Sequence, residues 1–354
     1  MNTANYSIEI ITPCFCSGAN AEQQAEIRAP SIRGQLRWWF RTLGGFKSLA
    51  ARGITPRQQE NEIFGNAAGN SGTASRLVVR VAANPSASLR SQTAKDSDGM
   101  DARMGCDRGY LLFPLRNKPR GVFDGSTPVR FQLRVQWRGL TEQWIDIQSL
   151  VTVFGQLGSL GFRSRRAMGA LAFESGTHDL ASSLSRFAAP GGLILRQLPA
   201  ANSRDAISVL ARWLKGWRAH GRTADHQRAR APEPPHNPGF RFARNDHDAG
   251  LNRPALETYR PALGLPIIQR YSTGNVSNWE FGSGGPRQPK GRFASPVILR
   301  PHRDAQGKWH SLVMFADVHK WPEGHPVYLK GQPRTVSLAL YDAMKSDPGL
   351  KPFP

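Results

Sequence analysis

The pattern of apolar and polar positions predicts a mixed fold of strands and helices. Strands are predicted where β-branched and apolar residues alternate or run together, at residues 7–16, 75–82, 129–137 and 169–174. Helices are predicted at residues 31–43 and 142–157, where apolar positions recur every three to four residues. The stripe that faces the core in the first helix comprises Ile32, Leu36, Phe40 and Leu43.

The order of these elements is βαββαβ, which is the ferredoxin-like, or RRM-like, arrangement. We therefore predict an α+β fold in which residues 1–176 form a first ferredoxin-like domain. A second domain of the same kind is predicted over residues 190–354, from the strands and the helix at residues 193–198, 205–220, 295–300 and 311–317. Residues 221–261, rich in Arg, Pro, Asn and His, predict a long irregular insertion in this second domain.

The net charge of the chain indicates the class of molecule that it binds. The chain has 47 Lys and Arg against 26 Asp and Glu, a formal net charge of +21 over 354 residues. Such a field favours polyanions, and the planar guanidinium of Arg suits phosphate in particular. Nucleic acid is therefore the expected partner class, and the alternative is that the charge serves solubility alone.

The sequence gives no reason to expect a membrane, a metal or a cofactor. No run reaches the roughly 20 apolar residues of a membrane span, and the N-terminal apolar run has no basic segment ahead of it. The expected location is the cytoplasm. Cys14, Cys16 and Cys106 are an odd number at no metal-ligand spacing, and Cys14 and Cys16 are most simply small core residues.

The first predicted helix has a basic side. Arg33, Arg37 and Arg41 form a stripe beside its apolar face, and no acidic residue occurs between Ile27 and Gln59. Ser31 is the predicted N-cap, so that its hydroxyl and the neighbouring backbone N–H groups offer a phosphate site. Arg28 precedes this site, and Gly34 lets a ligand backbone approach the first turn. The alternative interpretation is a solvated basic face.

A glycine- and arginine-rich loop follows the second predicted helix. Residues 155–169 read GQLGSLGFRSRRAMG. Gly155, Gly158 and Gly161 predict positive φ values or a close approach of another backbone, and the exposed N–H groups of the loop are suited to phosphate oxygens. In a ferredoxin-like unit this loop can lie beside the first helix, so that both basic features line one groove. The alternative is a tight turn with incidental arginines.

Aromatic residues are interleaved with these cations. They are candidates to stack bases, as in single-strand binders, although most are expected in the core: Trp38, Trp39, Phe40, Phe154 and Phe162. Catalysis is not expected, because the first histidine is His178 and a metal-free ribonuclease usually needs a general base near neutral pH. Tyr6 and Tyr110 are the remaining candidate bases. Asp96, Asp98 and Asp101, which could orient a metal-bound water, are more simply solvated loop residues.

Three blocks of the sequence together resemble the RAMP superfamily of CRISPR-associated proteins. They are ITPCFCSGANAEQQAEIRAPSIRGQLRWWFRTLGG, GSLGFRSRRAMG and RFASPVILRP. Within that superfamily they look most like the first RAMP subunit of the type III-B, or Cmr, effector complex. The loop departs from the family pattern in two places. Ser159 follows Gly158 where the family has paired glycines, and Ala167 stands where Gly-Phe-Gly begins.

The resemblance implies a non-catalytic RNA-binding subunit of a type III CRISPR effector, active in antiviral defence. It implies a cap near the 3′ end of the guide RNA that contacts guide RNA, target RNA or both, beside other RAMP subunits. By this likeness the RNA-binding residues are Arg28, Ser31, Arg33, Gly34 and Arg37 in the first block and Gly158, Gly161, Arg163, Ser164, Arg165 and Arg166 in the loop. Arg41 on the helix stripe joins them, as does Arg292 in the third block. The alternative for Arg292 and Ser295 is that the third block shapes the interface between domains.

Two other functions compete with this one. RAMP relatives include endoribonucleases that act on CRISPR RNA or target RNA, and such an enzyme is expected to carry a His, Tyr or Lys base beside its groove. A basic scaffold that binds only protein is the third possibility, and the two basic motifs argue against it.

Overall fold

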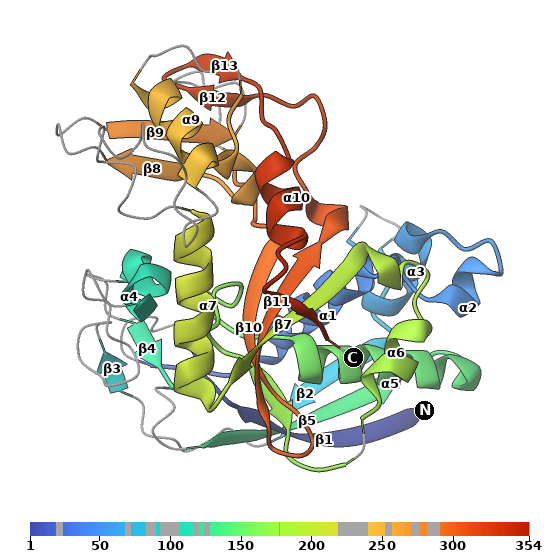
Figure 1. Ribbon diagram of the computed structural model, residues 1–354. Helices are drawn as coiled ribbons and strands as arrows, with labels where there is room; N and C mark the ends of the chain where they lie inside the picture. The colour runs from blue at the N-terminus through green and yellow to red at the C-terminus, as the bar shows by residue number, and fades with distance from the viewer. Residues whose placement is uncertain are drawn as a thin grey trace. The chain divides into compact units, whose positions relative to one another are not determined.

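A computed structural model describes the chain at residues 1–18, 24–67, 72–82, 90–92, 107–115, 120–123, 128–176, 178–218, 240–251, 257–270, 276–281 and 291–353 (Figure 1). The chain forms two compact units. The first comprises residues 1–210, 299–314 and 352–354, and the second comprises residues 211–298 and 315–351. The domain limits expected from the sequence stay a prediction beside this division.

The first unit is built on a four-stranded antiparallel sheet. Its strands are β1 (Asn2–Ile10), β2 (Leu77–Val81), β5 (Val129–Trp137) and β6 (Leu171–Phe173). They lie in the order β2-β5-β1-β6, with Ile8 opposite Phe131 on one side and Phe173 on the other. Each lies in or overlaps a predicted strand. However, β1 begins earlier than expected and ends at Ile10, before Pro13, which has no N–H to donate to a ladder.

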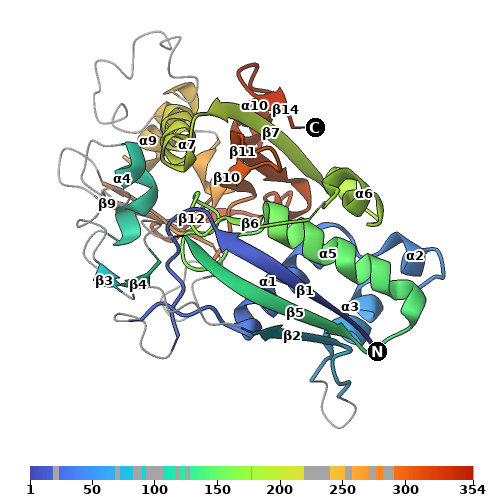
Figure 2. The same ribbon diagram turned by 90° about the horizontal axis from the view of Figure 1, so that it is seen from below.

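Helices α1 (Ala29–Thr42) and α5 (Trp144–Leu157) pack on each other and cover one face of this sheet (Figure 2). The predicted apolar stripe of α1 is fully buried, which confirms the helical periodicity of Ile32, Leu36, Phe40 and Leu43. The shorter elements of this unit are α2 (Lys47–Ala50), α3 (Pro56–Phe64), β3 (Arg90–Gln92), α4 (Asp107–Leu112), β4 (Arg120–Val122) and α6 (Leu180–Ser185).

A second four-stranded sheet has the order β10-β11-β7-β14. Its strands are β7 (Leu193–Ala200), β10 (Val297–Arg303), β11 (Trp309–Ala316) and β14 (Lys351–Pro352). Along the chain, α7 (Ser203–Trp217) follows β7, and α10 (Ala339–Lys345) lies between β11 and β14. The strands expected near residues 193, 295 and 311 and the helix expected near residue 205 are therefore present, with ends shifted by a few residues.

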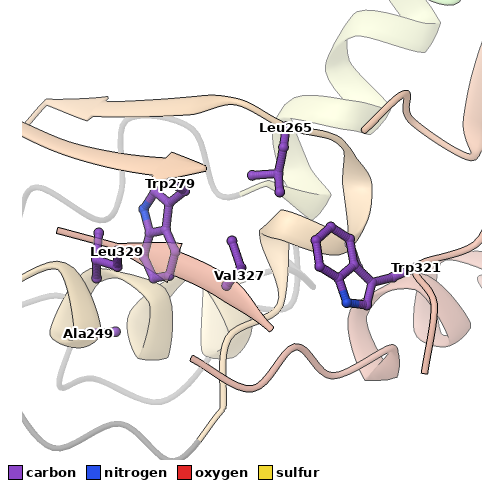
Figure 3. Close-up of a cluster of buried hydrophobic side chains, with 7 residues drawn as sticks. Ala249, Leu265, Trp279, Trp321, Val327 and Leu329 are labelled. Carbon is purple, nitrogen blue, oxygen red and sulfur yellow. The ribbon is translucent and has the colours of Figure 1, made fainter. Parts of the chain in front are cut away.

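The second unit has a further four-stranded sheet in the order β13-β12-β9-β8. Its strands are β8 (Ile267–Arg270), β9 (Val276–Phe281), β12 (Val327–Leu329) and β13 (Gln332–Arg334). Trp279 of β9 and Val327 and Leu329 of β12 are buried in one cluster with Ala249, Leu265 and Trp321 (Figure 3). Ala249 comes from helix α9 (Phe240–Gly250), which contributes this residue to the cluster.

Helix α9 corrects the prediction of an irregular insertion over residues 221–261. Phe240–Gly250 is helical, and Arg260–Leu263 forms a short 3-10 helix. Residues 221–239 and 252–256 lie outside the described part. The high polar content of this region masked a helix whose few apolar positions fall on one face. The fold is α+β, as expected, and no helix in the described residues is both long and apolar enough to cross a membrane.

Candidate nucleic-acid interface

The first turn of α1 differs from the sequence prediction. The helix begins at Ala29, so the N-cap is Arg28 and not Ser31, which lies exposed within the first turn. Pro30 presets the helical backbone, and the Arg28 carbonyl accepts from the N–H groups of Ser31 and Ile32 at 3.0 and 3.2 Å. No side chain caps this end.

The arginine stripe of α1 faces helix α3. Arg33 and Arg37 both donate to the carbonyl of Phe64, and Arg37 also donates to the carbonyl of Gly65 at 2.9 Å. These carbonyls are the unsatisfied acceptors at the C-terminal end of α3, where positive charge is favourable. Burial, with the nearby charge of Arg37, lowers the pKa of Arg33.

Glu60 of α3 neutralises the rest of the stripe. Arg41 makes a two-pronged contact with its carboxylate, with Nε donating at 2.6 Å, and Arg37 Nε lies 3.2 Å from the same carboxylate. The stripe therefore docks one helix on another. Whether these arginines also bind RNA stays a prediction.

Gly34 and Arg28 are exposed. A Cβ atom added to Gly34 would meet nothing within 4 Å, so the fold does not require glycine at this position. A glycine in a helix interior costs about 0.5 to 1 kcal/mol relative to alanine. The space beside Gly34 is therefore open to a ligand backbone, as the predicted close approach requires.

The glycine- and arginine-rich loop is held between two other segments by its backbone. The Phe162 N–H donates to the Phe15 carbonyl at 2.8 Å, after β1. On the other side, the Ala167 N–H donates to the Leu299 carbonyl of β10 at 2.9 Å, and the Leu299 N–H donates to the Arg165 carbonyl at 3.2 Å. A loop with contacts on both sides is a fixed element rather than a free one.

The backbone of this loop has left-handed residues in both halves. Of the three glycines for which a positive φ or a close approach was predicted, Gly161 has a φ of 80°, whereas Gly155 lies within α5 and Gly158 has a φ of −78°. Gly169, Arg163 and Ala167 also have positive φ values, of 67°, 66° and 68°. A non-glycine residue in this region is strained. At Gly161 an added Cβ would lie 2.6 Å from the Phe15 carbonyl oxygen, so the close backbone approach expected from the sequence is present.

The loop arginines contact α1 and α4. Arg163 Nε donates to the Leu111 carbonyl at 2.6 Å. The Arg165 guanidinium lies 4.9 Å from the centre of the Trp38 ring on α1, a cation–π geometry, and burial lowers its pKa. Arg166 donates to the carbonyl of Arg165. The contact with Trp38 confirms that the loop lies beside the first helix.

The aromatic residues divide as expected. Trp39, Phe40 and Phe154 are core residues with exposed fractions of 2% or less, whereas 45% of Phe162 is exposed. Trp38 is half-buried beneath Arg165. Phe162 therefore lies at the surface of the glycine- and arginine-rich loop, directly before its arginines.

Sequence reasoning missed Arg300 of β10, which is fully buried. Its guanidinium donates to the Gly158 carbonyl at 3.1 Å and to the Leu171 carbonyl at 2.5 Å, and thus joins the two ends of the loop. Nη1 also lies 3.0 Å from Nδ1 of buried His302. Burial lowers the Arg300 pKa to about 9. The sequence feature that could have indicated this role is a single arginine directly after the apolar residues 297–299.

The remaining candidates are Arg292, Ser295 and Tyr6, together with residues outside the described part of the chain. Arg292 is exposed in the second unit, and the Ser295 hydroxyl contacts the backbone of Val297. Tyr6 is buried, which raises its pKa to about 12, so it keeps its proton at neutral pH. Among the described residues no cluster of His, Cys, Asp or Glu could hold a metal. Asp96, Asp98, Asp101 and Cys106 are outside that part.

Comparison with known proteins finds similarity in this part of the chain. Residues 7–172, which include α1 and the loop, match the model of the RAMP superfamily, so this region is similar to that superfamily. Among its proteins, the chain resembles Cmr1. The CRISPR system Cmr subunit Cmr1-1 of Pyrococcus furiosus is 29% identical over 170 residues, which is 47% of this chain and 46% of that protein.

Two further comparisons agree. Cmr1-2 of the same organism is 26% identical over 184 residues, 48% of this chain and 95% of the relative. The crystal structure of Cmr1 from P. furiosus in its apo form aligns with 98% of this chain and 96% of its own, at 17% identity and a TM-score of 0.56. The structural likeness shows a shared fold. The match to Cmr1-1 spans about half of that relative's length.

Proposed function

We propose that this protein is a non-catalytic, RNA-binding subunit of a type III CRISPR effector complex. In this role it caps the complex near the 3′ end of the guide RNA and contacts guide RNA, target RNA or both. Other RAMP subunits are its protein partners. The relatives named as Cmr subunits support the assignment to this kind of complex.

The observation that carries the proposal is the contact of Arg165 with Trp38. It brings the arginine-rich loop against α1, so that the loop arginines lie at a surface that includes Trp38 of this helix. Arginines on a fixed backbone are suited to phosphate oxygens, which position a nucleic acid without reading its sequence. The net charge of +21 adds a long-range attraction for the same ligand.

The absence of catalysis is part of the proposal. Tyr6 is buried and holds its proton, and His178 stacks on Phe173 with ring centres 3.6 Å apart. Burial lowers the His178 pKa, and the His178 carbonyl accepts from Gln156 at the start of the loop. Tyr6 is therefore unavailable as a general base at neutral pH, and His178 is the remaining candidate that the variants below test.

We also propose that the two halves are tandem ferredoxin-like domains. Numbered along the chain within each set, both β2-β5-β1-β6 and β10-β11-β7-β14 have the order 2-3-1-4. In both sets a helix follows the first strand and another precedes the last. This is the order expected for a split βαβ unit.

A pull-down from the native host tests the proposal. The tagged full-length protein is purified, the bound RNA is sequenced and the co-purifying chains are identified. Recovery of repeat-derived guide RNA with other RAMP subunits is the expected result. Recovery of the protein alone or with unrelated RNA would contradict it.

The ribonuclease alternative is tested in the same preparation. The purified protein is incubated with the recovered guide RNA and with complementary RNA, with and without divalent metal. The account expects both RNAs to stay intact. Cleavage that is lost in a Tyr6→Phe or His178→Gln variant would establish an enzyme instead.

A further inference from the structure

We propose that the Phe162 ring is a stacking platform for an unpaired RNA base. The loop would then bind single-stranded RNA in preference to a duplex. This inference rests on the proposed function, because it specifies what the same loop recognises.

The first observation is selective exposure within the loop. Leu160 and Met168 are buried, whereas 45% of Phe162 is exposed. Full burial of a phenylalanine contributes about 1.5 to 3 kcal/mol, and the exposed part of Phe162 forgoes its share of that free energy. Among the described residues, Phe162 is the one aromatic side chain in the set of exposed large apolar residues, which also contains Met1, Leu140, Ile145, Ile268, Val276 and Val318.

The second observation is that the backbone holds this ring in place. The Phe162 N–H bonds to Phe15, and the next turn closes through the bond from the Arg166 N–H to the Arg163 carbonyl at 2.7 Å. The flanking residues Gly161 and Arg163 have positive φ values of 80° and 66°. A fixed ring loses little conformational freedom when a base stacks on it, which favours binding. Strain at a non-glycine residue is typical of binding and catalytic sites.

The third observation is the chemistry of the residues that follow the ring in the sequence. Arg163, Ser164, Arg165 and Arg166 follow Phe162 directly in the sequence. An aromatic face among cations is the combination that single-strand binders use, with the ring for a base and the cations for the phosphates. A duplex keeps its bases paired and stacked, so it offers such a ring no free base face. The cations also favour RNA over an apolar protein segment as the occupant.

The test measures the affinity of the full-length protein for an unstructured uridine-rich RNA oligonucleotide. The same strand annealed to its complement and the same strand with abasic nucleotides are the comparison probes. The variants are Phe162→Ala, Phe162→Trp and the control Ile145→Ala, which removes an equally exposed apolar side chain from α5. Thermal melts check that each variant folds.

Phe162→Ala is expected to weaken binding of the single strand by about 5-fold or more. It should not alter the salt dependence, because no phosphate contact is lost. Phe162→Trp should retain the affinity, Ile145→Ala should not change it, and the abasic strand should bind the wild type and Phe162→Ala equally.

The failure of this inference is distinct from the failure of the proposed function. If Phe162→Ala binds as tightly as the wild type while Arg163→Ala/Arg165→Ala/Arg166→Ala does not, stacking is refuted and RNA binding stands. If Phe162→Ala and the triple variant both leave RNA affinity unchanged, both fail. If Phe162→Ala loses a co-purifying protein but no RNA affinity, the ring contacts a protein partner and the inference is also refuted.

Discussion

The two arginine-rich motifs look alike in the sequence and differ in the structure. On α1, Arg37 and Arg41 contact the carboxylate of Glu60, and Arg33 and Arg37 contact carbonyls at the end of α3. In the loop, Arg163 contacts a carbonyl and Arg165 lies over an indole ring. The first motif joins two helices of the fold, and the second shapes a surface beside α1.

A basic stripe on a helix therefore has three possible partners. Solvent and nucleic acid are the partners usually considered. The C-terminal end of a neighbouring helix is the third, because its carbonyls and partial negative charge accept arginine donors. The predictions below separate the two motifs by what each one stabilises.

The largest effect is expected at the anchor of the loop. Arg300→Met removes the Arg300 donor from the Leu171 carbonyl and one of the two donors from the Gly158 carbonyl, which still accepts from the Leu171 N–H. This change is expected to cost about 2 to 3 kcal/mol in the free energy of unfolding. Chemical denaturation measures this loss, and hydrogen exchange should show faster exchange in the loop.

The control for this variant is Arg303→Met on the same strand. Arg303 pairs with Glu9 at 2.9 Å and is partly exposed, so its loss should cost about 1 kcal/mol or less. Equal stability of the Arg300→Met variant and the wild type would show that the loop does not depend on this anchor.

Acid should weaken the same anchor. Burial, together with the charge of Arg300, lowers the His302 pKa from 6.5 to about 3; His310 acts in the same direction and Asp304 opposes it. Between these values the unfolded chain binds a proton that the folded chain does not, so stability falls as pH drops below about 6.5. The loss from this group is at most about 1.4 kcal/mol per pH unit.

Denaturation curves between pH 7 and pH 5 measure the slope. His302→Gln keeps an acceptor for Arg300 but cannot titrate in this range, and it should flatten the pH dependence relative to the wild type. Parallel slopes in the two proteins would contradict a neutral, buried His302.

Replacing an arginine of the α1 stripe should lower the stability of the fold. Arg37→Met keeps an apolar stem but removes the donors to Phe64 and Gly65, and it is expected to cost about 1 to 2 kcal/mol in the free energy of unfolding. Arg57→Met, at an exposed position of α3, is the matched control and should change stability by less than about 0.5 kcal/mol. A stability loss no greater than that of the control would mean that α3 does not need the stripe.

The smallest effect is expected at Gly34. Because an added Cβ meets open space, Gly34→Ala should raise stability by about 0.5 to 1 kcal/mol. RNA affinity measured on the same variant shows whether α1 or the loop is the contact for RNA. Weaker RNA binding by a more stable protein would show that a ligand backbone does approach α1, and unchanged binding would leave the loop as the contact.

The sequence predicted the elements well because their signals are local. The alternation at residues 129–137 and the stripe from Ile32 to Leu43 need only near neighbours along the chain, and both are as predicted. The positive φ at Gly161 also agrees with the prediction from residue type. Helix α9 was missed because its apolar face is short and its surroundings are polar.

The partners of the arginines were not predictable in the same way. Glu60 lies just past the acid-free run and reaches Arg37 and Arg41 only when α3 folds back on α1. Arg300 meets Gly158 across more than a hundred residues of sequence. Such contacts depend on tertiary packing, which a single sequence pattern does not encode.

The measurement that tests the central claim most directly is the salt dependence of RNA affinity in two triple variants. Arg163→Met/Arg165→Met/Arg166→Met is compared with Arg33→Met/Arg37→Met/Arg41→Met, each verified as folded, on the same single-stranded RNA. The loop variant should lose affinity, and its slope of log affinity against log salt should flatten by about 0.7 for each lost phosphate contact. The helix variant should keep the wild-type slope. An unchanged slope in the loop variant would contradict the assignment of RNA binding to this loop.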